Sequence, residues 1–465
     1  MTRFIVRHRH EAERCPAANP YAGAGLLNYL SRPSLRQHGV EVQIEAVVRG
    51  EHALYMVVES DDEERVRQFV RPFAIIGTVD MYPAATCAEV VAGGGCEGSL
   101  PEYDLVTVHD PAQACQRAIE SGLVVRRAHP LNCETSIPAL VGSVVVPNAE
   151  FYVRNHFEIP KLDSSSWRLN VGGLVERPLS LGLRDLKNMK SGTLVATLEC
   201  AGNGRSLFEP SIEGEKWDLG AVGTAEWTGV PLAEVLERAG IRAGACELLF
   251  RGADRGTLPG QSVPIQFERS LSLDDASRSE ILLAYAMNGE PLPIQHGYPL
   301  RVIVPGWYAV ASVKWLTDID VIDKPFTGHY QTDSYFYEWN RGARVVREPV
   351  ALQRVRSLIT QPGANYEVQR GELLIRGVAW SGTAPIARVE VRIANGSWQQ
   401  ARLVGEPSRY RWQWWDLNAR IDTPGETTIR ARATDLAGLS QPEQPEWNRL
   451  GYGNNSVQKV RIRVQ

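Results

Sequence analysis

The sequence predicts an α+β protein built from three successive parts, and three observations lead to this prediction. Strand-like and helix-like patterns alternate over residues 1–95, the run Gly93-Gly94-Gly95 closes that region, and apolar and polar residues alternate in the C-terminal part. We expect a small domain with a ferredoxin-like α+β fold at 1–95, a connector at 96–135, a larger α+β domain at 136–335 and an immunoglobulin-like β-sandwich at 345–465.

The first part indicates a βαββαβ unit, and its second helix has the clearest signals. Ser60-Asp-Asp-Glu63 is a capping box, and Pro72 is expected to end the helix that follows. The apolar face of this helix is formed by Val66, Phe69, Val70 and Phe73. The remaining elements are a helix near 22–31 and strands at 3–10, 41–48, 53–58 and 84–91.

The larger domain contains one clear helix. It should begin at Pro231, run through Leu232, Val235 and Leu236, and stop at Gly240. In the last part, Val389, Val391 and Ile393 alternate with charged residues, as do Val460, Ile462 and Val464. Turns are indicated by Pro362-Gly363, Asn395-Gly396 and Pro424-Gly425. This pattern is typical of an all-β sandwich.

Composition excludes several functional classes. The chain has 465 residues, a net charge of −4, 43% hydrophobic and 22% charged residues, which gives no electrostatic reason to bind nucleic acid or an anionic membrane. It contains no run of about 18 apolar residues that would span a membrane. The first residues, MTRFIVRHRH, lack the apolar core of a secretion signal, so we expect a cytoplasmic protein.

The seven cysteines do not form a recognisable framework. They lie at positions 15, 87, 96, 115, 133, 200 and 246, without a C-x-x-C motif, which argues against a zinc ribbon or a disulfide scaffold. Cys200 differs from the others because the strand-like run 193–199 delivers it into the glycine-rich turn Ala201-Gly-Asn-Gly-Arg205. Taken alone, this segment fits either a buried thiol before a tight turn or a thiolate metal ligand favoured by a nearby arginine.

A series of segments surrounds Cys200 in the sequence. They are, in order, Phe151–His156, Thr197–Arg205, Trp217–Trp227, Leu283–Gly289 with Pro291-Leu-Pro293, His296–Arg301, Val304-Pro-Gly306 and Val313–Leu316. Together these segments resemble the molybdenum domain of the sulfite oxidase family, and the sandwich resembles the dimerisation domain of that family. The resemblance covers residues 136–465 and implies a bacterial-type molybdopterin enzyme without a haem domain.

The resemblance implies a role for each matching residue. Cys200 would be the protein ligand to molybdenum, Arg154 and Arg205 would recognise an anionic substrate, and Trp217 would close the oxyanion pocket. The pterin and its phosphate would be held by Tyr152, Val153, Arg154, Asn155, His156, Asp254, His296, Arg301, Ser312, Val313 and Lys314. This set agrees with chemistry, because a phosphate dianion needs several charged donors and a pterin edge needs amide and carboxylate partners. Individually, Arg301, Lys314, His296, Trp217 and Trp227 also fit ordinary structural roles.

Three positions depart from the sulfite-oxidising pattern. Gly204 replaces the first of two arginines, and the active-site tyrosine falls near Thr327, so that Tyr330 or Tyr308 would have to substitute for it. The family arginine near the C-terminus is shifted by one position to Arg449, and a shift of one residue on a strand reverses the side-chain direction. These departures put sulfite itself in question as the substrate.

The first 95 residues raise a second hypothesis. His8 and His10 share one face of a strand and Cys15 follows, so these residues could bind a metal or could form a polar strand end beside a buried thiol. A ligand-sensing or scaffolding role for this unit is a third possibility. The chain shows no flavin, b-type haem or C-x-x-C-H motif, so electrons should pass to or from an external partner, or to a group in the first 95 residues.

The leading functional hypothesis is a homodimeric oxidoreductase that uses molybdenum and molybdopterin to transfer oxygen to sulfite or a related small sulfur compound or oxyanion. The first alternative is a reductase that removes oxygen from a sulfoxide or nitrate at the same site. The second alternative is a non-catalytic molybdopterin-binding or interaction module, since a fold alone does not fix chemistry.

Overall fold

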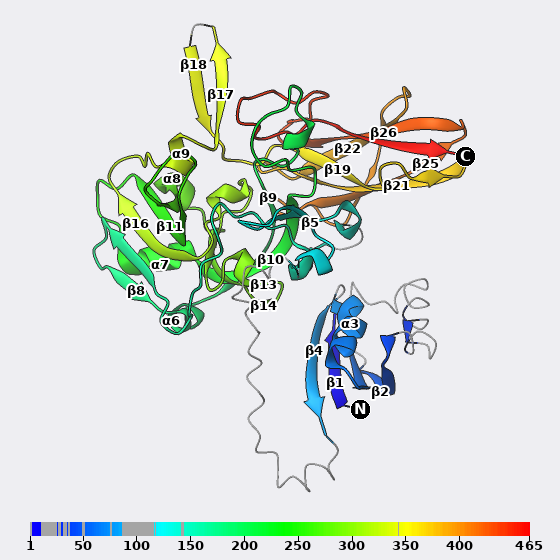
Figure 1. The fold of residues 1–465 in the computed structure, drawn as a ribbon, viewed down its shortest axis with the longest axis horizontal. Coiled ribbons are helices and arrows are strands. Elements are labelled where there is room, and N and C mark those ends of the chain that lie inside the picture. The colour runs from blue at the N-terminus through cyan, green and yellow to red at the C-terminus, as the bar shows by residue number, and fades with distance from the viewer. Residues whose placement is uncertain are drawn as a thin grey trace. The chain divides into compact units, whose positions relative to one another are not determined.

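The structure is a computed structural model that divides the chain into two compact units, Met1–Val106 and Thr107–Gln465. Each unit is described by itself (Figure 1). The residues that the structure describes are 2–10, 26, 29, 30, 35, 38–48, 52–74, 77–85, 116, 118–140, 144–342 and 344–465.

The first unit contains a four-stranded antiparallel sheet in the order β2-β3-β1-β4. One face of this sheet and helix α3 (Glu63–Ala74) share a core in which Phe4 and Val6 meet Phe69 and Phe73. The predicted apolar face of the helix is therefore confirmed. The strands are β1 (Thr2–Arg9), β2 (Glu41–Val48), β3 (Ala53–Ser60) and β4 (Thr78–Ala84).

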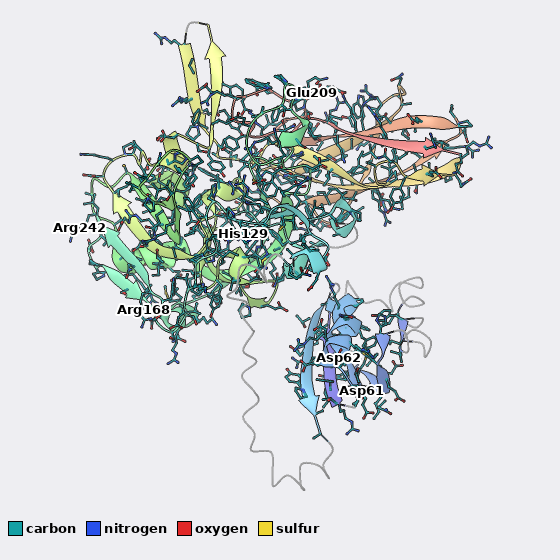
Figure 2. All side chains as sticks on the ribbon, in the orientation of Figure 1. Asp61, Asp62, His129, Arg168, Glu209 and Arg242 are labelled. Atoms are coloured by element: carbon teal, nitrogen blue, oxygen red, sulfur yellow. The ribbon has the colours of Figure 1, made fainter. Side chains whose placement is uncertain are left out.

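Several predicted details of this unit were wrong. The backbone N–H of Glu64 donates to Asp62 Oδ1 at 2.9 Å, so Asp62 rather than Ser60 caps helix α3. Asp62 is labelled in Figure 2. Pro72 lies inside the last turn and does not end the helix. Strand β4 (Thr78–Ala84) was not predicted, and the strand predicted for 84–91 lies almost entirely outside the described residues. The helix expected near 22–31 and the stretch 86–91 lie outside the described residues, apart from isolated positions, so the ferredoxin-like assignment stays a prediction.

Two five-stranded sheets form the larger part of the second unit. The first has the order β14-β13-β10-β9, with β15 also paired to β13, and the second has the order β12-β11-β16-β7-β8. The first sheet contains β9 (Gly192–Glu199), β10 (Val222–Pro231), β13 (Leu282–Met287), β14 (Glu290–Pro291) and β15 (Arg301–Ile303). The second contains β7 (Leu169–Gly173), β8 (Leu179–Leu181), β11 (Glu247–Gly256), β12 (Ile265–Ser272) and β16 (Leu316–Ile322).

Short helices fill the connections between these strands. Helix α7 (Leu232–Ala239) begins after Pro231 and ends at Gly240, whose φ of 70° suits glycine, and this confirms the predicted helix. The other short helices are α6 (Leu183–Lys187), α8 (Leu273–Ala276), α9 (His329–Thr332), η3 (Ile137–Leu140), η4 (Asn148–Glu150), η5 (Arg205–Leu207), η6 (Ile294–His296) and η7 (Ala309–Ala311). In the part of the chain that the structure describes, no helix is long and apolar enough to cross a membrane.

The end of the predicted connector packs into the second unit. Strands β5 (Val124–Arg127) and β6 (Asn132–Glu134) form a hairpin. Leu131 and Cys133 share a small core with Val153 and Trp315. Residues 118–135 therefore help to build the body that contains the site.

The C-terminal part is a sandwich of two sheets, in the orders β19-β21-β25-β24 and β20-β27-β26-β22-β23, around one apolar core. Val389, Val391, Val460 and Ile462 are buried in that core, as their alternation predicted. The immunoglobulin-like assignment stays a prediction. The strands are β19 (Arg356–Gln361), β20 (Glu367–Val368), β21 (Gly371–Trp380), β22 (Ile386–Ile393), β23 (Gln399–Gln400), β24 (Arg402–Val404), β25 (Gln413–Ile421), β26 (Gly425–Asp435) and β27 (Gln458–Val464).

The strand that leads to Cys200 lies against this sandwich. Strand β9 is the edge of its own sheet, and its Thr197 N–H donates to the Tyr410 carbonyl at 2.8 Å. Leu198 and Cys200 share an apolar cluster with Trp380 and Trp412 from the sandwich. A separate ribbon of β17 (Phe336–Arg341) and β18 (Arg344–Pro349) projects from the body of the unit (Figure 1).

Candidate active site

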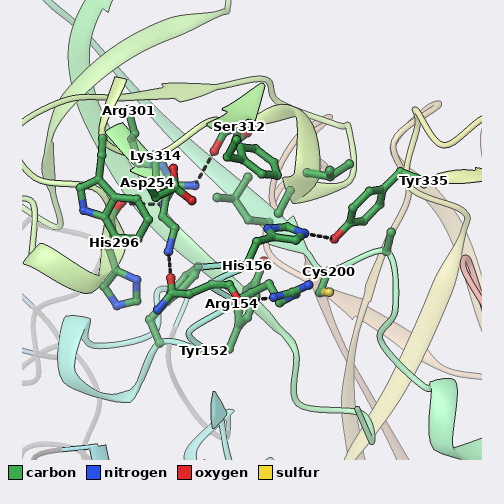
Figure 3. A pocket seen from close by; sticks show the side chains of 18 residues that line it. Tyr152, Arg154, His156, Cys200, Asp254, His296, Arg301, Ser312, Lys314 and Tyr335 are labelled. Carbon is green, nitrogen blue, oxygen red and sulfur yellow. Dashed lines mark hydrogen bonds between the residues drawn. The ribbon is translucent and has the colours of Figure 1, made fainter. Parts of the chain in front are cut away.

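A cavity of about 650 Å³, open solvent at its mouth included, lies within the second unit. Most of the residues predicted for the cofactor line it, although they come from distant parts of the chain (Figure 3). These are Tyr152, Arg154, Asn155, His156, Cys200, Asp254, His296, Arg301, Ser312 and Lys314.

Cys200 stands in the wall of this cavity at the end of β9. Its N–H donates to the Ala221 carbonyl at 2.9 Å, and its own carbonyl accepts from the Asn203 N–H at 2.9 Å, which closes the tight turn. The side chain is buried, and burial raises the pKa of the thiol while the guanidinium of Arg154 opposes this shift. Figure 3 shows the sulfur beside Arg154. The thiol is therefore held where a soft metal centre could bind it.

The opposite wall of the cavity is basic. Arg301 donates to the His296 carbonyl at 2.9 Å and to the Ser312 carbonyl at 3.2 Å, while Lys314 donates to Asn155 Oδ1 and to the Gln295 carbonyl. Burial lowers the pKa of Arg301 to about 10 and that of His296 to about 3. The pKa of Lys314 is also lowered. Burial is the larger cause, and repulsion from the Arg301 charge is the second. A bound anion would relieve this concentration of buried cationic groups.

Two buried polar atoms of this wall have no partner, and they test whether a cofactor fits. Asp254 Oδ1 and Arg301 Nε are both buried without a hydrogen bond, which is costly unless a ligand satisfies them. Burial raises the pKa of Asp254 to about 6, against the opposing charge of Lys314. One acceptor, several cationic donors and one thiol fit the donor-rich edge of a pterin, its phosphate and a metal.

Tyr335 is a cavity residue that sequence reasoning missed. Its hydroxyl and His156 Nε2 are hydrogen-bonded at 2.6 Å, and its ring stacks on Tyr452 with centroids 4.8 Å apart. Tyr335 has a φ of 58°, a conformation that non-glycine residues rarely adopt and that clusters at functional sites. No recognisable motif surrounds Tyr335. The only sequence signal is that it is one of the tyrosines that follow Thr327, where the family tyrosine was expected.

Four predicted residues do not line the cavity. Arg205 is buried behind the turn, donates to the Glu215 carbonyl at 3.2 Å and lies over the Tyr452 ring. Trp217 is fully buried in the apolar cluster that contains Cys200. Val153 and Val313 are core residues whose neighbours in sequence face the cavity. These placements favour supporting roles over contact with substrate.

The structure shows what surrounds each of the three positions that depart from the family pattern. Gly204 has a φ of 81°, and a Cβ there would lie 2.9 Å from Arg356 Nη2, so an arginine would strain the backbone and displace the Arg356 side chain. Tyr308 and Tyr330 are buried outside the cavity lining. Arg449 is exposed and pairs with Glu338 at 3.2 Å, so it does not reach the cavity.

The histidines of the first unit contact each other. His10 Nδ1 lies 3.1 Å from His8 Nε2, while Cys15 lies outside the described residues. Among the described residues, no group of three or more His, Cys, Asp or Glu side chains is arranged to hold a metal ion. Because Cys15 is not among these residues, the metal hypothesis for this unit stays a prediction.

Comparison with known proteins places these residues in a family. A model of the oxidoreductase molybdopterin binding domain matches residues 156–330, and a model of the Mo-co oxidoreductase dimerisation domain matches residues 348–465. Sulfite oxidase of Arabidopsis thaliana is 34% identical over 372 residues, which cover 74% of this chain and 94% of the relative. The chain belongs to the sulfite oxidase family of molybdopterin oxidoreductases.

Other members of the family differ in length and chemistry. Mitochondrial sulfite oxidase of Rattus norvegicus is 35% identical over 364 residues, covering 74% of this chain and 66% of the relative. The rice nitrate reductase [NADH] 1 is 33% identical over 72% of this chain and 40% of its own. The structure of the sulfane dehydrogenase SoxCD from Paracoccus pantotrophus matches with a TM-score of 0.63 and 30% identity, over 72% of this chain and 85% of that chain. Membership implies a molybdenum cofactor and an enzyme of the sulfite oxidase type.

Proposed function

We propose that this protein transfers an oxygen atom to sulfite or a related small sulfur compound or oxyanion and passes electrons to an external acceptor. The observation that carries the proposal is the position of Cys200, whose thiol enters the wall of a cavity beside Arg154 and faces a cationic wall with unpartnered polar atoms. When bound, the molybdenum cofactor supplies two-electron oxygen-atom transfer. The protein supplies binding, orientation and a positive field.

The residues divide this work between two ends of the cavity. We assign the pterin and phosphate to Asp254, His296, Arg301, Ser312 and Lys314, because the unpartnered donor and acceptor atoms lie there. Cys200 would be the metal ligand. Family membership favours an enzyme over the non-catalytic module considered from the sequence.

The substrate end is assigned to Arg154, His156 and Tyr335. Arg154 supplies a permanent positive charge beside Cys200 that would attract an oxyanion. Burial and the charge of Arg154 lower the pKa of His156, so its imidazole is neutral and can share a proton with the Tyr335 hydroxyl. These two neutral groups would orient the substrate through hydrogen bonds and would not form an ion pair with it.

The ligand assignment is tested with Cys200→Ser. We expect this variant to fold and to bind the pterin but to lose oxygen transfer, because serine is a poor match for a soft metal centre. Metal analysis, circular dichroism and steady-state rates would be compared with those of the wild-type protein. Full activity in the variant would refute the assignment.

The direction of the reaction is tested by two assays of wild-type protein produced in a molybdenum-competent host. One assay supplies sulfite and an artificial electron acceptor, and the other supplies nitrate or a sulfoxide and a reduced dye. We expect turnover with sulfite or another reduced sulfur compound. A nitrate reductase is among the relatives, so nitrate reduction is the reductive alternative that a relative supports. Turnover only in the reductive direction would replace our proposal.

We also propose a cytoplasmic location, as expected from the sequence, and cell fractionation would test it.

A further inference from the structure

A buried charged network joins the residue before Cys200 to the C-terminal sandwich. Glu199 is the last residue of β9, and its side chain is 1% exposed. Its Oε1 accepts from Arg356 at 2.8 Å and from the Asn203 side chain at 3.0 Å, and its Oε2 accepts from Trp380 Nε1 at 2.9 Å. Arg356 and Trp380 are paired residues of the sandwich strands β19 and β21.

The network continues into the turn that carries the thiol. Arg356 also donates to the Asn203 carbonyl at 3.2 Å, and Asn203 in turn bonds the Cys200 carbonyl through its N–H. Two further bonds from the sandwich side reach the same turn, from the Gly453 N–H to the Ala201 carbonyl and from the Asn454 side chain to the Gly204 carbonyl, both at 2.8 Å. The turn is thus held on one side by β9 and on the other by residues of the sandwich.

A buried ion pair of this kind is an expensive way to stabilise a fold. Its desolvation cancels much of the attraction between the charges, and an apolar pair of similar volume often stabilises as well. The pair does fix geometry, because a carboxylate with three donors at set distances has one position. The Arg356 side chain also packs closely against the turn, since a Cβ on Gly204 would lie 2.9 Å from Arg356 Nη2.

We propose that Arg356 and Trp380 are positioning residues for the active site, which act through Glu199 and Asn203 to fix where the Cys200 thiol stands. The C-terminal domain is then part of the catalytic unit and not only a surface for dimerisation. This inference rests on the proposed role of Cys200 as the metal ligand.

The test uses two buried tryptophans of the same apolar cluster. Trp380→Phe removes the N–H that bonds Glu199, whereas Trp412→Phe removes an N–H that has no hydrogen-bond partner. We expect Trp380→Phe to lower kcat by roughly ten- to a hundredfold with little change in KM, because a small misplacement of a reacting group has effects of this size. Trp412→Phe should retain the wild-type kcat.

A second readout does not depend on turnover of the loaded enzyme. In protein from a host that makes no molybdenum cofactor, the rate of Cys200 alkylation by iodoacetamide should change in Trp380→Phe and not in Trp412→Phe. In loaded protein, the thiolate-to-metal charge-transfer absorption should shift only in Trp380→Phe. Tyr410→Phe keeps the backbone bond between Tyr410 and Thr197 of β9 but removes the side-chain bond to Glu280. It controls for a general loosening of the contact between the sandwich and the rest of the unit.

Substitutions in the Glu199–Arg356 ion pair distinguish an effect on the position of the thiol from an effect on stability. Arg356→Met leaves the Glu199 charge buried and should lower both the melting temperature and kcat, while Arg356→Lys should recover part of both. The double variant Glu199→Gln with Arg356→Met removes both charges of this pair, so we expect it to recover the melting temperature but not kcat. Recovery of both in the double variant, or equal behaviour of the two tryptophan variants, would overturn the proposal. A wild-type protein without molybdenum would instead refute the proposed function.

Discussion

At the residue scale, the Tyr335 hydroxyl is the polar group of the cavity whose role is most open to a direct test. Tyr335→Phe keeps the ring that stacks on Tyr452 but leaves His156 Nε2 without its partner at 2.6 Å. Because an unpaired buried polar atom costs about 1–3 kcal/mol, we expect kcat/KM for the active substrate to fall about tenfold. Steady-state kinetics would measure this.

Tyr330→Phe is the matched control for this substitution. The Tyr330 ring also packs on His156, with centroids 4.5 Å apart, but this residue does not line the cavity. We expect its rates to stay close to those of the wild-type protein. Equal losses in the two variants would show that the hydroxyl of Tyr335 has no special function and that only the packing around His156 matters.

Gly204 tests why this chain lacks the arginine of the family pattern. Gly204→Ala places a Cβ at a φ of 81° and 2.9 Å from Arg356, whereas Gly244→Ala meets a similar φ of 89° in open space. We expect a loss of about 1 kcal/mol for Gly244→Ala from the backbone alone, and of about 2–3 kcal/mol for Gly204→Ala because a steric conflict is added. Denaturant unfolding would measure both, and equal losses would argue that Arg356 leaves room for a side chain.

The residues of the site differ in how far sequence could reveal them. Cys200 and Arg154 lie in segments with a recognisable order of neighbours, and both line the cavity. Tyr335 has no such context, because its position depends on a positive φ and on the stacking partner Tyr452, which is far away in sequence. Trp217 shows the opposite case, in which a residue from a matching segment is a core side chain.

At the element scale, strand β1 contains a histidine that should make the first unit sensitive to acid. His8 is 1% exposed, and its pKa is lowered from the ordinary 6.5 to about 4. Burial is the larger cause, and repulsion from His10 is the second. Below the ordinary value the unfolded chain binds more protons at His8 than the folded unit does. The contribution of His8 to stability therefore falls as the pH drops from about 6.5 to about 4 and does not change above this window. The full loss is at most about 3 kcal/mol.

Hydrogen exchange of the full chain, corrected for its intrinsic pH dependence, would measure this effect. We expect protection in β1 and β3 to fall across this window in the wild-type protein. The fall should be smaller in His8→Phe, where His10, whose pKa is also lowered by burial, still titrates. Residues 330–465 contain no histidine, so peptides from β26 are an internal control. Parallel loss of protection in β26 would mean that acid acts on the whole chain and not through His8.

Elements with local start and stop signals could be predicted from the sequence, and others could not. Helix α7 has a proline before its first turn and a glycine after its last, and its bounds agree with the prediction. The start of α3 was misplaced because Ser60 and Asp62 are both good caps and only the fold decides between them. The Glu199–Arg356 pair joins elements 157 residues apart, and no local pattern announces such a contact.

At the scale of the whole molecule, the C-terminal domain has two functions to separate. The family model over residues 348–465 is a dimerisation domain and supports a homodimer, which sedimentation of the full chain should show as a closed pair. A domain that served dimerisation alone could be removed to leave a folded, monomeric enzyme. The contacts of β9 argue against that outcome.

We expect a chain truncated after residue 345 to be insoluble or free of molybdenum, and not a smaller active enzyme. The truncation removes the partners of Thr197, Glu199 and Gly204 and exposes the apolar cluster in which Trp380 and Trp412 cover Leu198. Edge strand β9 would then present unpaired backbone groups next to exposed apolar surface, a combination that favours aggregation. Solubility, circular dichroism and metal content of the truncated chain would decide the matter. A soluble, molybdenum-loaded monomer would show that the two domains are independent and that the sandwich contributes nothing to the thiol turn.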